Sequence, residues 1–192
     1  MKSSLQPFIT SRPDSFWCKP KHWLLQLALT LLLMPLIGLV HADEYGTVNQ
    51  LIKQGKLETA SQKIENFLKD KPQDVQMRFL KGMVLSQQKR STEAQAVFSQ
   101  LTEDFPELPE PYNNLAVLYA EQGLYDKARV TLEAALRNNP AYSTARENLG
   151  DVYLRLAQQT FEKVMQTESN NQSAQYKLDQ LRSLNRSHSK IK

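Results

Sequence analysis

The feature that most constrains this chain is a set of residues that recur every 34 positions. Pro72, Pro106 and Pro140 follow one another at this interval. Five further columns with this period hold small or apolar residues: Ala60, Ala94 and Ala128; Leu51, Leu85, Tyr119 and Tyr153; Gly82, Ala116 and Gly150; Ile64, Phe98 and Leu132; Phe67, Leu101 and Ala135. A fixed period of roughly 20–50 residues is typical of arrays in which each repeat packs only against its neighbours. The sequence therefore predicts a repeat protein.

Residues 111–139 show what one repeat contains. Apolar side chains recur at helical spacing from Tyr112 to Tyr119. Gln122-Gly123 then interrupts the pattern, as expected where a helix ends. A second stripe follows before the proline column, and its members are Ala128, Leu132 and Ala135. The repeat is predicted to be an antiparallel helical hairpin, which buries both of its apolar faces only when neighbouring hairpins stack on it.

These residues resemble the tetratricopeptide repeat (TPR) family, whose 34-residue signature is W-x2-L-G-x2-Y, then A-x3-F, then P. The central repeat fills the seven slots with Tyr112, Leu115, Ala116, Tyr119, Ala128, Leu132 and Pro140. The resemblance implies an all-α fold, a right-handed α-solenoid of TPR helical hairpins with a C-terminal capping helix. The TPR domain is expected over 43–185, with repeats at about 43–74, 75–108 and 109–142. The repeat at 75–108 departs from the signature, because Arg78 and Lys81 stand where large apolar residues are usual.

The fourth repeat, 143–168, is shorter than the others. In this unit Ala157, the next small residue of the signature, comes four positions after Tyr153, whereas the other units have a gap of nine. Because the residues of a turn are missing, and no Gly or Pro lies between Asp151 and Thr167, we expect one continuous helix over about 142–168. A capping helix over 172–185 and a disordered basic tail over 186–192 are expected to follow.

An apolar run near the N-terminus indicates an export signal. Residues 23–40 carry no charge, four basic residues and one acidic residue precede them, and small residues lead into an acidic segment. This order is typical of a secretory signal, so we predict a signal peptide over 1–42 with its apolar region at 23–40 and cleavage after Ala42. The alternative is an uncleaved anchor, since a run of this length is near the minimum span of a bilayer. Pro35 and Gly38 favour cleavage because they break a helix.

The location of the charge argues against nucleic acid as a partner. The whole chain has a formal net charge of +4. Residues 43–192 keep 20 basic and 19 acidic residues, so their net charge is about +1. The basic balance therefore belongs mainly to the export segment, and nucleic-acid binding is not expected. Contact with a membrane is expected only through an uncleaved signal anchor.

Residues suited to catalysis or metal binding are scarce. Cys18 is the one cysteine and precedes the apolar run, and after residue 42 the one histidine is His188. We therefore predict no catalytic residues, no metal site, no cofactor and no enzymatic activity. The competing hypothesis is a hydrolase that uses a pair from the carboxylates in the proline-rich connection, which are Glu103, Asp104, Glu107 and Glu110.

The concave side of the stacked first helices is the predicted binding site. Asn114 and Asn148 are one period apart, so they are expected to stack, and the resemblance implies that an Asn in this slot holds an extended peptide. The competing interpretation is that Asn here is simply a frequent consensus residue. Other residues expected to face this groove are Phe79, Met83, Asn113, Val117, Glu147 and Asp151. Phe79 and Met83 fit core packing equally well, and the absence of basic residues disfavours a C-terminal carboxylate as ligand.

The sequence thus predicts an exported TPR scaffold or adaptor of the bacterial cell envelope. Its partner is expected to be a protein or peptide bound in the groove, and its location the periplasm. The alternative is an inner-membrane assembly factor that keeps residues 23–40 as a permanent span. The two hypotheses differ only in whether the chain is cleaved after Ala42.

Overall fold

The computed structural model describes residues 44–188, with side chains described through residue 184. The signal peptide predicted over 1–42, its apolar region and the cleavage point lie outside the described residues. Residues 45–192 group as one compact unit, and this unit is described by itself. Among the helices of residues 44–188, none combines the length and the apolar character needed to cross a bilayer.

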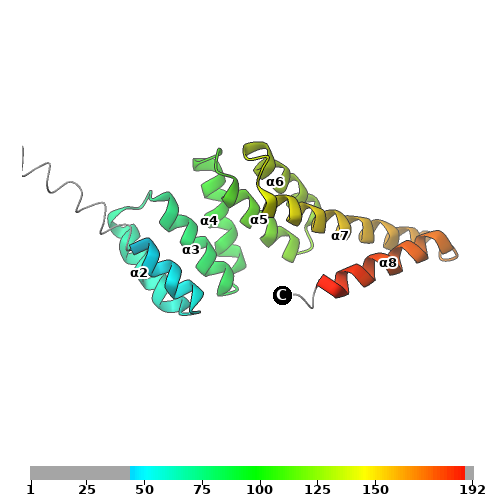
Figure 1. The fold of residues 1–192 in the computed structure, drawn as a ribbon, viewed down its shortest axis with the longest axis horizontal. Helices are drawn as coiled ribbons and strands as arrows, with labels where there is room; N and C mark the ends of the chain where they lie inside the picture. Colours follow the sequence, from blue (N-terminus) through cyan, green and yellow to red (C-terminus); the bar gives the residue numbers. More distant parts are fainter. Residues whose placement is uncertain (1–43, 189–192) are drawn as a thin grey trace, which may run out of the picture. The chain divides into compact units, whose positions relative to one another are not determined.

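The described part of the chain is built from helices that pack in sequential order (Figure 1). A helix over 44–53 shares one core cluster with α2. Two further hairpins follow as α3 with α4 and α5 with α6. This arrangement confirms the predicted all-α class and the TPR hairpins. The bounds are α2 Leu57–Asp70, α3 Val75–Gln87, α4 Ser91–Asp104, α5 Pro109–Glu121, α6 Tyr125–Asn138, α7 Ser143–Thr167 and α8 Gln172–His188.

The turn inside each complete hairpin is set by one backbone position. Gly55, Lys89 and Gly123 follow one another at the interval of the repeat and have φ of 70°, 61° and 75°. This left-handed conformation reverses the chain at a helix end and suits glycine best. Position 157, one period after Gly123, holds an alanine inside α7. The turn is therefore absent at this position, and α7 continues as one helix.

The apolar columns of the repeat form the core. Phe98 on α4 is fully buried and packs where α3 carries Gly82. A Cβ added to Gly82 would lie 2.7 Å from two ring carbons of Phe98, which is shorter than a normal carbon contact of roughly 3.5 Å. The glycine at position 82 is therefore required by the ring that α4 inserts.

The basic residue at position 78 is explained by an ion pair between hairpin helices. Arg78 donates from Nη2 to Oδ2 of Asp104 at 2.6 Å, and its guanidinium lies 5.9 Å from the ring centre of Phe105. Asp104 also accepts a hydrogen bond from the side chain of Gln100 at 2.9 Å. At this position the usual packing of a large apolar residue is thus replaced by a charge-assisted hydrogen bond between α3 and the C-terminal end of α4.

α8 returns along α7 (Figure 1). The Lys177 ammonium lies 5.4 Å from the Phe161 ring centre, and Arg182 pairs with Glu162 at 3.4 Å. The capping helix predicted to end at 185 extends to His188, so the boundary predicted for the tail is wrong. Residues 185–188 contain no Gly or Pro that would end a helix, and residues 189–192 lie outside the described part.

Candidate binding surface

The residues predicted to line a groove lie on the first helices of successive repeats, α3, α5 and α7. On α3, Phe79 and Met83 are half-buried and pack against the core clusters. The Phe79 ring meets the Phe98 ring in a T-shaped contact, with centroids 5.6 Å apart and an angle of 61° between planes. Phe79 and Met83 fitted either groove lining or core packing in the sequence, and their contacts support core packing.

The asparagines join α5 to α7, but in a different pairing from the expected one. Asn148 donates from Nδ2 to Oδ1 of Asn113 at 2.8 Å, and Asn113 is only 6% exposed. Asn114 instead donates to the backbone carbonyl of Glu110 in its own helix, at 2.9 Å. Residues in the same slot of stacked helices point in the same direction, so a contact between helices joins different slots. The side-chain hydrogen bond between α5 and α7 therefore uses Asn113, the neighbour of Asn114 in the sequence.

The remaining predicted residues are exposed around this amide pair. Val117 is 36% exposed, and Glu147 and Asp151 are exposed on α7. We call the set Asn113, Asn114, Val117, Glu147, Asn148 and Asp151 the α5/α7 surface. It combines an apolar side chain, three amides and two carboxylates, and it contains no basic side chain.

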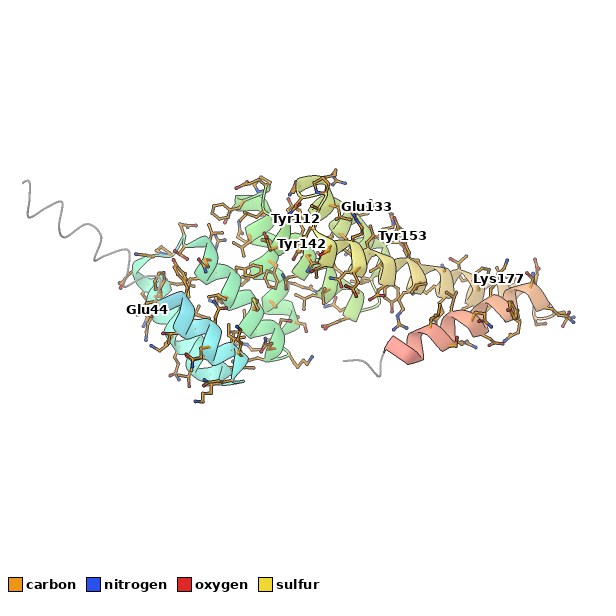
Figure 2. All side chains as sticks on the ribbon, in the orientation of Figure 1. Glu44, Tyr112, Glu133, Tyr142, Tyr153 and Lys177 are labelled. Carbon is orange, nitrogen blue, oxygen red and sulfur yellow. The ribbon has the colours of Figure 1, made fainter. Side chains whose placement is uncertain are left out.

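A further carboxylate, Glu110, adds to the negative charge near this surface. Glu110 is exposed one turn before Asn114. Burial, and secondly the charge of Glu110, raise the pKa of the Tyr142 hydroxyl above its ordinary value. Figure 2 shows Tyr142 near the start of α7, and both Tyr142 and Tyr112 pack against the same core cluster. Sequence reasoning placed Glu110 only in the carboxylate cluster of the proline-rich connection. Its spacing of four from Asn114 is the signal that places both residues on one side of α5.

The carboxylate cluster considered for hydrolysis contains a structural ion pair. The hydrogen bond from Arg78, followed by that from Gln100, lowers the pKa of Asp104 below its ordinary value. A general acid needs the opposite shift, toward neutral pH. Asp104 is thus held as a carboxylate that links α3 to α4.

Family models for the tetratricopeptide repeat match the chain in two places. One model covers residues 45–109 and another covers residues 85–150. Together they span residues 45–150, more than half of the 192 residues. The chain therefore belongs to the tetratricopeptide repeat family.

A curated protein similar to this chain is the chloroplastic tetratricopeptide repeat domain-containing protein PYG7 of Arabidopsis thaliana. The two are 28% identical over 167 residues, which are 82% of this chain and 55% of the relative. The chain thus spans about half the length of the curated relative it matches.

Solved structures share the fold. The first TPR of Spaghetti (RPAP3), bound to the HSP90 peptide SRMEEVD, aligns with a TM-score of 0.56 and 16% identity over 60% of this chain and 92% of that chain. The Yersinia enterocolitica type III secretion chaperone SycD, in complex with a peptide of the translocator YopD, gives a TM-score of 0.54 and 14% identity over 59% and 92%. At these identities the likeness shows the fold alone.

Proposed function

We propose that this chain is a non-enzymatic scaffold of the bacterial cell envelope that binds an extended segment of a partner protein on its α5/α7 surface. The observation that carries the proposal is the amide pair of Asn113 and Asn148, which joins the first helices of two successive repeats. Asn148 is half-buried and uses one of its two N–H donors in this bond, so its second N–H and its carbonyl oxygen leave capacity for a ligand. An extended backbone presents alternating N–H and C=O groups that match this capacity.

The side chains around the pair suggest the chemistry of the partner. Val117 offers an apolar contact, while Glu110, Glu147 and Asp151 supply negative charge. A segment with an apolar residue next to Lys or Arg therefore complements this surface. The peptide SRMEEVD in the Spaghetti structure has three acidic residues and would meet like charge here.

The binding test measures affinity for short synthetic peptides by fluorescence anisotropy, using the full chain. Peptides with alternating apolar and basic residues are expected to bind, and SRMEEVD is the acidic comparison. Asn113→Ala and Asn148→Ala are each expected to weaken binding by up to about tenfold, the equivalent of one hydrogen bond. Glu147→Lys is expected to weaken it further, and more at low salt than at high salt.

The matched control is Asn66→Ala on α2, an exposed asparagine that accepts a hydrogen bond from Lys69 far along the chain from this surface. Its affinity is expected to equal that of the unchanged chain. Equal binding by the unchanged chain and both Asn variants would refute the role of the α5/α7 surface. Preference for the acidic peptide would refute the proposed partner chemistry.

The proposed location is the periplasm, and the order of basic, apolar and small residues in 1–42 supports it. The alternative is anchoring in the inner membrane through residues 23–40. Intact-mass measurement of the protein recovered from the envelope distinguishes the two, because cleavage after Ala42 removes the mass of the segment 1–42. Recovery of the chain only from the cytosolic fraction would contradict both.

A further inference from the structure

The first helix of a complete repeat carries a seam that receives the second helix of the same repeat. In α3 this seam contains Gly82 and Leu85, both buried, with the Phe98 ring of α4 lying on Gly82. In α5 the same slots hold the buried Ala116 and the half-buried Tyr119, which pack in the clusters around α4 and α6. A small residue and a larger one three positions later thus form one packing surface.

In the fourth repeat the same seam lies open. Gly150 is exposed, and a Cβ added to it would meet nothing within 4 Å. Tyr153, in the slot of Leu85 and Tyr119, is 49% exposed. Because α7 continues straight past this point, no second helix of its own repeat covers the seam (Figure 2). We call the exposed residues Arg146, Gly150 and Tyr153 the open seam of α7.

The neighbouring helices leave this seam accessible. The contacts of α8 through Lys177 and Arg182 are made with Phe161 and Glu162, on the second half of α7. α6 borders the seam at Glu133, whose carboxylate accepts a hydrogen bond from the Tyr153 hydroxyl at 3.4 Å. The seam is therefore the packing surface of a TPR hairpin without its second helix.

The residue pattern of the open seam also resembles the pattern of the second helix that is missing from this repeat. Second helices present a small residue followed by larger apolar ones, as in Ala94, Phe98 and Leu101. Within the seam, Gly150 and Tyr153 repeat the order of a small residue and then an aromatic ring one turn later. An antiparallel helix with this pattern fits the seam as α4 fits α3, and α7 of a second copy is such a helix.

We propose that the open seam pairs with the same seam of a second copy about a two-fold axis, so that Tyr153 of each copy packs on Gly150 of the other. Such an isologous contact uses one patch twice and closes without further assembly. The glycine allows close approach of the two α7 helices, and the aromatic ring fills the space above it, as Phe98 does over Gly82.

The charges beside the seam agree with this pairing. The exposed Arg146 lies at the N-terminal end, where it also donates to the backbone carbonyl of Pro140, and the Glu133 carboxylate lies beside the Tyr153 hydroxyl. Because Tyr153 of each copy packs on Gly150 of the other, one helical turn after Arg146, the pairing brings Glu133 of each copy close to Arg146 of the other. Glu133 also pairs with Arg129 at 2.9 Å, so this carboxylate would lie between two guanidinium groups. Opposite charges therefore meet twice in the dimer.

Native mass spectrometry of the full chain over a range of concentrations tests the proposal, in a mild detergent because residues 23–40 are apolar. The unchanged chain is expected to show a dimer that grows with concentration. Gly150→Lys is expected to weaken the dimer by about tenfold or more, because it places a charged side chain at the centre of the contact. The monomer tolerates the change because nothing lies within 4 Å of the new Cβ. Its helical circular dichroism is therefore expected to be retained.

A charge exchange provides the second measurement. Arg146→Glu and Glu133→Lys are each expected to weaken the dimer, and the double variant to restore part of it. Val130→Lys on α6 is the control, because Val130 is 51% exposed, like Tyr153, but lies outside the seam. A chain that remains monomeric at all concentrations overturns the proposal. A dimer unaffected by Gly150→Lys, or additive losses in the charge-exchange pair, would also overturn it.

Discussion

The same substitution at two equivalent positions is expected to have opposite effects on stability. Gly82 and Gly150 occupy one slot of the repeat, two periods apart, and both lie in helices. Gly→Ala in a helix gains about 1 kcal/mol from backbone propensity. At Gly150 the new methyl group meets nothing within 4 Å, so the expected result is a stabilisation of about 0.5–1 kcal/mol.

At Gly82 the methyl group overlaps a buried ring. The new Cβ lies 2.7 Å from Cε1 and Cζ of Phe98, so the ring must move by about 0.8 Å to reach an ordinary contact. That movement also disturbs the T-shaped contact of Phe98 with Phe79. Overpacking of this kind costs about 1–3 kcal/mol, so the net change at Gly82 is a loss of about 0–2 kcal/mol. Because the propensity gain is common to both sites, the difference between the two variants isolates the clash at about 1–3 kcal/mol.

Urea unfolding followed by circular dichroism measures this difference, at a protein concentration low enough to avoid self-association. A repeat array unfolds in segments, so the curves are fitted with a nearest-neighbour model instead of a single transition. Phe98→Leu combined with Gly82→Ala is the internal check, because the smaller side chain leaves room for the methyl group and the two changes should be less than additive. Equal stabilisation by Gly82→Ala and Gly150→Ala would refute the reasoning.

Three further predictions concern the turns and the ionisable groups. Lys89 has φ of 61° in the slot that holds glycine in the neighbouring repeats, so Lys89→Gly is expected to stabilise the chain by up to about 1 kcal/mol. Gly123→Ala, at φ of 75°, should destabilise the chain by about as much. Thermal unfolding compares the two variants. The hydrogen bond from Arg78 lowers the pKa of Asp104, so this carboxylate contributes stability at neutral pH that is lost as the pH falls below 3.8, the ordinary pKa of the group. Asp104→Asn should therefore flatten the acid limb of a curve of stability against pH. An unchanged acid limb contradicts the prediction. Burial, together with the 2.6 Å hydrogen bond to Asp74, raises the pKa of Tyr45 from 10.0 to about 12. The stability contributed by the neutral phenol is therefore present below pH 10 and is lost between pH 10 and 12. Tyr45→Phe should remove this alkaline loss of stability in the same measurement.

Local signals in the sequence locate the helices well. Gly55 and Gly123 mark turns that the structure places at positive φ, and the proline column follows the second helix of each hairpin. These residues act through their own backbone conformation, so their effect can be predicted without knowing which residues they contact in the fold. Lys89 is the exception, because its turn is imposed by the period and not by the residue type.

Contacts between helices are less accessible to sequence reasoning. The period relates Asn114 to Asn148, whereas the hydrogen bond joins Asn148 to Asn113. A period identifies equivalent positions, but a contact depends on how two helices face each other, which requires the packed structure. Similarly, helical spacing fitted Phe79 equally well to the groove or to the core, and the contact of its ring with the Phe98 ring supports core packing.

Continuation of α7 through the turn position limits growth of the array to the part of the chain that precedes α7. Tandem duplication of a module of one period upstream of α7 would insert a complete hairpin between existing ones and leave both termini unchanged. Duplication of α7 itself would copy a rod of 25 residues with no reversal, which cannot continue the stack. Evolution or engineering of longer variants is therefore expected to add modules before residue 143 and to keep a single copy of α7.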